Sequence, residues 1–446
     1  MSEEPKGARM NTRALMVGTL LTFIFTGRTV AVEPATVPAA VSPRAYCANA
    51  KMELFVHYTL GTYHDGHYMG TWTDPQGKPA TDLNAVADAL DVKALASVAK
   101  GMGAQYVIFT AYHAGMNLMY PSPLWGKVFP NKVSKRDLIG DLADALKAEG
   151  ISLILYVHPD DRHDLTAAEQ KMLVEKGWST MVNITTEPDE KHIDPAWYAT
   201  YVRLIDEIGS RYGSRIYGYW QDGPRCGGPK VQAAMLKHTP DAAIWINGGS
   251  SGPPATLIGD EAWNHKPDRQ HEWAATVTGN WFASGGKMTR TPRDMYQTTV
   301  LWAATQGQVN GGIAWAAGPY VNNEWETGVA EAFKELGRLM HANGKAIYGT
   351  VASTSYVTSQ DSQPKWGVAT DSADGSTVYL HVFNSPKDTS LQISKASDGR
   401  VFDRATLLSN GEAVKLTVTD EGYVLTLPKA ERWSDVDTVL CLGIKK

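Results

Sequence analysis

Three carboxylates lie where they could support catalysis. The stretch YGYWQDGPRCGG is apolar and aromatic until it breaks at Asp222, while Glu261 in IGDEAWN and Glu272 in HEWAATVTGNW follow later. An Asp-Gly pair can be a simple turn, and either glutamate can be a solvated loop residue. Hydrolysis of a glycoside with retention, however, needs a nucleophile and an acid/base about 5–5.5 Å apart. We therefore predict Asp222 as a nucleophile and one glutamate, kept protonated by burial beside Trp263 or Trp273, as its partner.

Apolar strands alternate with amphipathic helices in the elements that must position these residues. We expect strands at 53–58, 104–112, 151–158, 214–222 and 242–248, and helices at 91–103, 134–150, 194–213 and 230–239. Strands that are apolar almost throughout, separated by helices of ten or more residues, indicate a parallel sheet covered on both faces. The number of such units predicts an α/β fold with a (β/α)8-type, TIM-like barrel.

In such a barrel the active site lies at the carboxyl ends of the strands. His57, His113, His158 and Asp222 each stand at the end of a different predicted strand, and Asn247 has a similar position. These side chains are therefore expected to converge.

The pattern changes after about residue 347. STVYLHVFN, TSLQISKA, AVKLTVTDEGYVLTLP and DTVLCLGI are short alternating runs with turn residues between them, which is typical of antiparallel β structure. We predict a signal peptide at 1–31, a linker at 32–48, a catalytic barrel at 49–347 and a C-terminal antiparallel β-sandwich at 348–446.

The N-terminal segment has the charge order of a secretory signal. Basic residues precede the apolar run ALMVGTLLTFIF, and small residues follow it around Ala31. The run is too short to span a bilayer. We expect cleavage near Ala31, a secreted or periplasmic protein, and no integral membrane segment after removal of the signal.

Composition narrows the class of partner. With 42 basic and 47 acidic side chains and a net charge of −5, the chain has no electrostatic footprint for nucleic acid. The excess of 14 Trp and 19 Tyr over 9 Phe favours a carbohydrate surface, because these rings combine an apolar face with a polar edge. The three cysteines lack metal-ligand spacing and allow at most one disulfide. Nothing in the sequence specifies an oligomeric state.

Seven segments occur in the order of the landmarks of one enzyme family: FVHYTLGTY, AQYVIFTAYHAGMNLMY, SKRDLIGDL, ISLILYVH, YWQDG, HEWAATVTGNW and LMHANGKAIYGT. Over about residues 50–350 the chain resembles the α-L-fucosidases of glycoside hydrolase family 29. The resemblance implies an exo-acting, retaining hydrolase that removes terminal α-L-fucose from an oligosaccharide or glycoconjugate. It implies no cofactor and no metal.

The resemblance also implies roles for single residues. It makes Asp222 the nucleophile and assigns the sugar's hydroxyl groups to His57 and His113. IGDEAW, with HEW shortly after it, is similar to the acid/base segment of one subgroup and favours Glu261, whereas the more general Trp-Glu landmark favours Glu272. The remaining candidates, for apolar contact with the sugar, are Tyr63, Trp72, Trp220 and Trp281.

Two departures from the family pattern concern sugar recognition. HAGMN replaces the usual His-His-Asp-Gly-Phe run, so Ala114 and Gly115 stand in place of a histidine and an aspartate. One lost buried hydrogen bond is worth about 1–3 kcal/mol, which leaves the choice of sugar open. Val157 and His158 replace the usual tyrosine and serine, and we hypothesise that His158 supplies the missing contact.

Other functions fit parts of the sequence. HDGH and HPDDRHD suggest a metal-dependent barrel hydrolase, but such sites need three or four convergent ligands and the first strand offers only His57. A different sugar or reaction on the same barrel, α-L-galactosidase-like or a lyase, is a second alternative. A catalytically impaired sugar-binding protein is a third, although it does not explain why both Asp222 and a later glutamate are present.

Overall fold

The structure, a computed structural model, describes most of the chain beyond residue 40. The described ranges are 41–64, 67–71, 74–158, 165–175, 195–222, 228–247, 257–261, 272–307, 311–359, 361–429 and 431–445. The predicted signal peptide, Trp72 and Cys226 lie outside these ranges. Helix α1 spans Pro43–Asn49, within and just beyond the predicted linker at 32–48, and the Ser42 side chain caps it.

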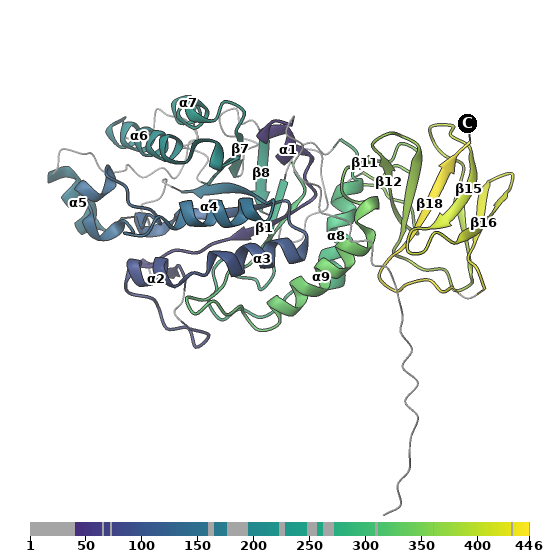
Figure 1. The fold of residues 1–446 in the computed structure, drawn as a ribbon, viewed down its shortest axis with the longest axis horizontal. Helices are drawn as coiled ribbons and strands as arrows, with labels where there is room; N and C mark the ends of the chain where they lie inside the picture. Colours follow the sequence, from purple (N-terminus) through teal and green to yellow (C-terminus); the bar gives the residue numbers. More distant parts are fainter. Residues whose placement is uncertain are drawn as a thin grey trace, which may run out of the picture. The chain divides into compact units, whose positions relative to one another are not determined.

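Eight parallel strands close into a barrel (Figure 1). In spatial order they are β1 (Met52–Val56), β10 (Ile313–Ala316), β9 (Glu272–Thr276), β8 (Leu257–Glu261), β7 (Ala243–Asn247), β6 (Gly218–Gln221), β5 (Ser152–Val157) and β4 (Tyr106–Tyr112). Strands β1, β4, β5, β6 and β10 are buried along their whole length, as expected when helices cover one face and packed side chains the other. The predicted TIM-like barrel is confirmed.

Helices connect the strands and cover the outside of the barrel. They are α2 (Leu83–Ala89), α3 (Val92–Met102), α4 (Leu138–Ala148), α5 (Ala167–Glu175), α6 (Pro195–Tyr212), α7 (Pro229–His238), α8 (Pro292–Ala304) and α9 (Val329–Asn343). Local sequence sets their ends. The Asp91 carboxylate accepts hydrogen bonds from two backbone N–H groups at 3.0 Å to start α3, and Gly103 ends that helix with a φ of 89°. Thr291 and Asp294 form a capping box at the start of α8.

Alternate strand residues form a second core within the barrel. Its large members, Phe55, Tyr156, Trp220 and Trp245, are each at most 2% exposed. The Trp220 ring centroid lies 5.4 Å from that of Phe55 and 6.2 Å from that of Trp245. Small residues on facing strands leave room for these rings: a Cβ on Gly259 would lie 2.6 Å from the Trp220 ring. The aromatic side chains thus form a close-packed floor beneath the carboxyl ends of the strands.

The C-terminal part is a curled antiparallel sheet with a core of its own. Its strands, in spatial order, are β11 (Thr350–Ala352), β12 (Gly367–Ser372), β13 (Thr377–Val382), β18 (Thr438–Ile444), β15 (Phe402–Leu407), β16 (Ala413–Val418), β17 (Gly422–Thr426) and β14 (Ser390–Ser394). The predicted C-terminal β-sandwich is confirmed. The predicted boundary at 347 falls between a 3-10 turn, Gly344–Ala346, and β11.

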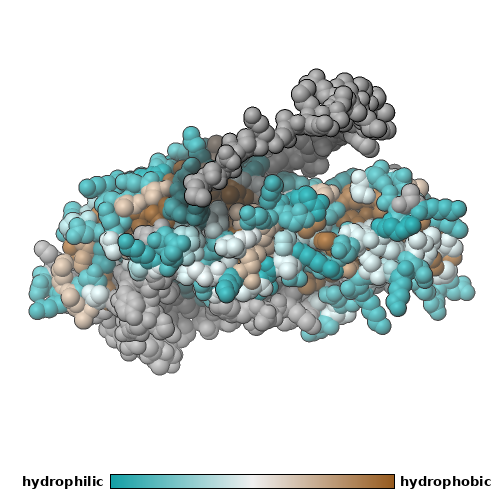
Figure 2. Space-filling model, turned by 90° about the horizontal axis from the view of Figure 1, so that it is seen from below, coloured by the Kyte–Doolittle hydropathy of each residue, from teal (hydrophilic) through white to brown (hydrophobic). Residues whose placement is uncertain are grey.

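One face of the molecule is mostly hydrophilic, with smaller hydrophobic areas between the polar side chains (Figure 2). None of the helices in the described ranges combines the length and the hydropathy that a membrane span requires.

Candidate active site

Polar side chains from neighbouring strands meet at the carboxyl end of the barrel. His57 directly follows β1, His113 follows β4, His158 follows β5 and Asp222 follows β6. Two further residues end their strands, Asn247 in β7 and Glu261 in β8. Because β4 to β8 are consecutive neighbours in the barrel, the convergence of strand ends puts these groups on one face.

The two candidate carboxylates share one amide. The Asn247 side-chain nitrogen donates to Asp222 Oδ1 at 2.9 Å and to Glu261 Oε1 at 2.9 Å. A carboxylate can only accept hydrogen bonds, and an amide NH2 group carries two hydrogens, so one nitrogen can satisfy both acceptors. The facing carboxylate oxygens are therefore at most twice this bond length apart.

Asp222 is held at its second oxygen as well. The Tyr156 hydroxyl donates to Asp222 Oδ2 at 2.6 Å, and the His158 Nε2 atom lies 3.9 Å from the same oxygen. The Asp222 backbone N–H bonds to the Val157 carbonyl at 2.9 Å and continues the parallel ladder. With its side chain 23% exposed, Asp222 is fixed in orientation and still accessible to a small molecule.

Glu261 has the electrostatic setting of an acid. Burial raises the pKa of its carboxyl group, and the nearby Asp222 and Asp260 carboxylates raise it further. Asn247 and His158 lower the same pKa. Its neighbour Asp222 accepts two hydrogen bonds that favour the anion. The two carboxyl groups thus differ in their surroundings: Glu261 has a raised pKa, and Asp222 accepts two hydrogen bonds.

His57 and His113 are buried as neutral imidazoles. Burial lowers the pKa of His57 to about 3, and it holds the pKa of His113 well below its ordinary value. His57 Nδ1 lies 3.1 Å from the Thr110 hydroxyl oxygen, whose own hydrogen is directed to the Val56 carbonyl at 3.2 Å. This network assigns the ring proton to Nδ1 and leaves Nε2 as an acceptor, suited to a hydroxyl group.

Aromatic rings surround the histidines. Around His57, the ring centroids of Phe55, Phe282 and Trp281 lie at 4.8, 5.0 and 5.8 Å. Trp281 is half-buried. Trp220 is 1% exposed, so it supports Phe55 from below and offers almost no surface of its own to a ligand. Apolar rings thus pack directly against the two buried histidines.

Three predicted site residues, Glu272, Tyr63 and Trp72, are not placed in this cluster by the described part of the chain. Glu272 is the first residue of β9, and its backbone pairs in register with Gly259, which stands two residues before Glu261 on β8. The side chain of Glu272 lies outside the described part. Tyr63 lies in β2 (Thr62–His64), which pairs with β3 (His67–Met69). The side chain of Tyr63 and the whole of Trp72 lie outside the described part of the chain. HDGH and HPDDRHD are only partly described. Within the described ranges, no group of three or more metal-ligating side chains could hold an ion.

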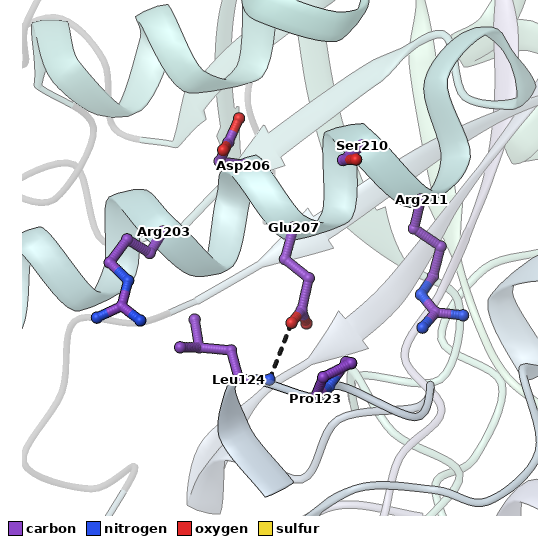
Figure 3. Close-up of a pocket in the computed structure, with 7 residues that line it drawn as sticks. All are labelled: Pro123, Leu124, Arg203, Asp206, Glu207, Ser210 and Arg211. Carbon is purple, nitrogen blue, oxygen red and sulfur yellow. Dashed lines mark hydrogen bonds between the residues drawn. The ribbon is translucent and has the colours of Figure 1, made fainter. Parts of the chain in front are cut away.

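A separate surface pocket lies on the outer side of the barrel, between α6 and the segment around Leu124 (Figure 3). Its carboxylates have structural partners. Glu207 accepts from the Leu124 backbone N–H at 2.9 Å, and Asp206 accepts from Lys237 and His238 at 2.9 and 2.8 Å. None of the predicted site residues lines it, so the strand-end cluster is the better candidate active site.

The comparisons with known proteins identify the family of the chain. The profile described as Alpha-L-fucosidase matches residues 44–345, which is more than half of the chain. The chain belongs to the α-L-fucosidase family. Members of this family are glycoside hydrolases. An Arabidopsis thaliana protein named Alpha-L-fucosidase 1 is 26% identical over 222 residues, covering 47% of this chain and 37% of that protein. The chain spans little more than a third of the length of the curated plant relatives that it matches.

Solved fucosidase structures share the fold. Alpha-L-fucosidase isoenzyme 1 from Paenibacillus thiaminolyticus is 20% identical with a TM-score of 0.65, covering 91% of this chain and 99% of that one. A GH29 α-L-fucosidase from Bacteroides thetaiotaomicron, solved as a trapped covalent intermediate with 2-fluoro-fucosyl fluoride, is 19% identical with a TM-score of 0.65, covering 90% and 96%. The divergence from these fucosidases is therefore large in sequence and small in architecture.

The segment that departs from the fucosidase family pattern is held by a buried lysine. Ala114–Met116 form a single 3-10 turn, with Gly115 at a φ of 80° and Met116 at 51°. The Lys132 ammonium donates to the Gly115 carbonyl and pairs with Glu169 of α5 at 2.7 Å. Lys132 thus links the turn that follows His113 to helix α5.

Two residues of this cluster, Tyr156 and Asn247, are not among the site residues predicted from the sequence. Tyr156 lies within the apolar strand ISLILYVH, and Asn247 is predicted only as a strand end. A signal existed for Tyr156, because it stands two residues before His158 and alternate strand residues share a face. For Asn247 the sequence gives only the position, since the two bonds that it donates join residues 25 and 14 positions away.

Proposed function

We propose that this member of the α-L-fucosidase family is an exo-acting hydrolase that removes terminal α-L-fucose, or a close relative of it, from glycans with retention. The observation that carries the proposal is the pair of carboxylates, Asp222 and Glu261, joined by one amide nitrogen at 2.9 Å each. Retaining glycosidases have carboxyl groups about 5–5.5 Å apart, and inverting enzymes have about 6.5–9.5 Å. The short span across Asn247 supports the retaining class.

The proposed reaction is a double displacement. A carboxylate oxygen of Asp222 attacks the anomeric carbon, the bond from that carbon to the leaving oxygen breaks, and Glu261 gives its proton to the departing oxygen. The now ionised Glu261 takes a proton from water, the water oxygen attacks the same carbon, and Asp222 leaves as a carboxylate. The two inversions give net retention, and no cofactor takes part in either step.

The walls of the site support a deoxy sugar as substrate. Neutral His57 and His113 can exchange hydrogen bonds with ring hydroxyls without adding charge. The half-buried Trp281 ring, beside buried Phe282, lies close to His57, and such an apolar ring suits the methyl group of a 6-deoxy sugar. L-galactose carries a hydroxyl at that position and would lose part of this contact.

A panel of aryl α- and β-glycosides, followed by proton NMR of the first-formed sugar, tests the proposal. We expect the α-L-fucoside to be the best substrate and the α-anomer of fucose to appear first. The β-anomer first would contradict retention. No hydrolysis of any glycoside, with sugar binding still measurable, would favour a catalytically impaired binding protein instead.

Tyr156→Phe is expected to lower kcat/KM about tenfold to a hundredfold, because a hydrogen bond to a charged group is lost. The lost donor favoured the Asp222 anion, so the pKa of that carboxyl should rise. The acid limb of the pH profile of kcat/KM should therefore move to higher pH. A reduced rate with an unmoved acid limb would mean that Tyr156 does not act through Asp222.

His158→Ala tests whether that ring makes up for the lost histidine. The ring stands parallel to His113 at 5.0 Å between centroids, and its Nε2 lies 3.9 Å from Asp222. We expect KM for the fucoside to rise about tenfold, the size of one neutral hydrogen bond. The exposed His341 on α9 provides a matched control, His341→Ala. If His158→Ala left both KM and kcat at wild-type values, the compensation hypothesis would be abandoned.

A further inference from the structure

Asn247 occupies the strand between the two that carry the carboxylates. Strand β7 pairs with β6 on one side and with β8 on the other, with Asn247 in register with Gly259. The backbone of Asn247 is therefore paired with β8, and the residue before it, Ile246, is paired with Gln221 of β6. Its side chain reaches Asp222 and Glu261 from a point between them, which a residue on either outer strand could not do.

The orientation of this amide has a consequence for the proton on Glu261. Its nitrogen faces both carboxyl groups, and an amide nitrogen donates but does not accept. Glu261 Oε1 must therefore be an acceptor whenever the bond at 2.9 Å is made. In the protonated acid the hydrogen is consequently carried by Oε2, the oxygen that Asn247 does not bind.

We propose that Asn247 is a positioning residue that holds Asp222 and Glu261 at one fixed separation and directs the transferable proton of Glu261 to Oε2. The inference rests on the proposed function for its catalytic meaning. In the resting enzyme one hydrogen of the amide supports the nucleophile, and the other orients the acid. Between the two chemical steps, the same donor stabilises Glu261 as the carboxylate that must activate water.

Several other charged or titratable groups face this pair. Tyr156 and His158 approach Asp222 from β5 and the residue after it, and Asp260 lies beside Glu261 on β8, where its Oδ1 accepts from the Glu261 backbone N–H at 2.7 Å. Asp260 and Asp222 raise the pKa of Glu261, whereas His158 and Asn247 lower it. Asn247 is the one member of this described set that touches both carboxylates with a neutral donor.

The test is the pH profile of kcat/KM for wild type and Asn247→Ala on an aryl α-L-fucoside. Removing a donor from a carboxylate raises the pKa of that carboxyl group. The acid limb, set by ionisation of Asp222, and the alkaline limb, set by loss of the Glu261 proton, should therefore both move to higher pH. The maximum of kcat/KM should fall about tenfold to a hundredfold, as expected for hydrogen bonds to charged groups.

Two further variants separate positioning from a general loss of structure. Asn247→Asp keeps the size but replaces the donor with a third carboxylate, so it should move both limbs further and lower the rate more than alanine does. Asn84→Ala removes an amide on α2 whose oxygen accepts from the Lys135 backbone N–H at 2.9 Å, outside the site. That control should keep the wild-type profile.

If wild type hydrolyses the fucoside and Asn247→Ala has a pH profile with the same acid and alkaline limbs as wild type, the positioning role is overturned. The proposed function then still stands. If wild type hydrolyses no glycoside, the proposed function fails, and crystal structures of wild type and Asn247→Ala at one pH decide the positioning claim. There we expect the carboxyl groups of Asp222 and Glu261 to separate or rotate in the variant. Unchanged carboxyl positions would overturn the claim.

Discussion

Asp222→Ala is expected to lower kcat on an aryl α-L-fucoside by about 10⁴-fold or more, as for loss of a nucleophile in other covalent mechanisms. The side chain is 23% exposed and stands after the end of its strand, so the barrel core does not depend on it. The variant should therefore keep a melting temperature near that of wild type. Steady-state kinetics with thermal unfolding measures both effects on one preparation. A loss of less than about tenfold in a folded variant would remove Asp222 as the nucleophile.

Azide should restore part of the activity of Asp222→Ala. The small anion can occupy the space vacated by the carboxylate and attack the anomeric carbon once, so the product should be the β-fucosyl azide, of inverted configuration. Proton NMR of the product identifies the anomer. The same concentration of azide should not accelerate wild type. An inverted azide formed by Glu261→Ala, and not by Asp222→Ala, would reverse the two roles.

Glu261→Ala is expected to show an effect that depends on the leaving group. A dinitrophenolate departs without a proton, so the first step on a dinitrophenyl fucoside should stay close to the wild-type rate in pre-steady-state measurements. A natural glycan needs the acid, and its hydrolysis should fall by about 10²–10⁴-fold, the usual contribution of general acid catalysis. Hydrolysis of the glycosyl enzyme should also slow, because the same group activates water.

Glu272→Ala is the competing variant for this prediction. Its backbone stands at the amino end of β9, whereas Glu261 ends β8 and contacts Asn247. We expect Glu272→Ala to lower the rates on the dinitrophenyl fucoside and on the glycan by similar factors, if at all. A selective loss on the glycan by Glu272→Ala, with Glu261→Ala near wild type, would assign the acid/base to Glu272.

The positions of the site residues along the chain could be predicted because strand ends are visible in a sequence. Apolar runs that stop at His57, His113, His158 and Asp222 mark the carboxyl ends of strands, and barrel geometry brings such ends together. Strand starts were less accurate: the predicted strand at 214–222 begins as a 3-10 turn, Gly213–Arg215, and only Gly218–Gln221 is extended. The error does not affect the site, because the site depends on where strands end.

The bonds between those residues could not be predicted. Within ISLILYVH, Tyr156 follows the apolar pattern of its neighbours. Its hydroxyl reaches Asp222 because β5 pairs with β6 so that Tyr156 is in register with Trp220. Asn247 meets its partners for a similar reason, since pairing of three strands sets its position. Register is a property of long-range pairing, and a pattern within one strand does not contain it.

Composition predicts a linker at 32–48, and helix α1 begins within that range. The proline and alanine content of the range is typical of a spacer, yet Ser42 followed by Pro43 is a helix start: serine caps, and proline is tolerated in the first turn. The Ser42 hydroxyl oxygen accepts from the Ala45 backbone N–H at 3.3 Å and begins α1. A local capping signal in the sequence therefore marks the start of this helix.

The most direct test of the central claim, that Asp222 is a nucleophile facing Glu261, is to trap the sugar on the enzyme. Glu261→Gln treated with 2-deoxy-2-fluoro-fucosyl fluoride should accumulate a covalent adduct, because the fluoride leaves without acid help and the fluorine slows the second step. Mass spectrometry of the digested protein should find the fluorosugar on Asp222. An adduct on another carboxylate, or hydrolysis of natural substrate by Asp222→Ala at the wild-type rate, would contradict it.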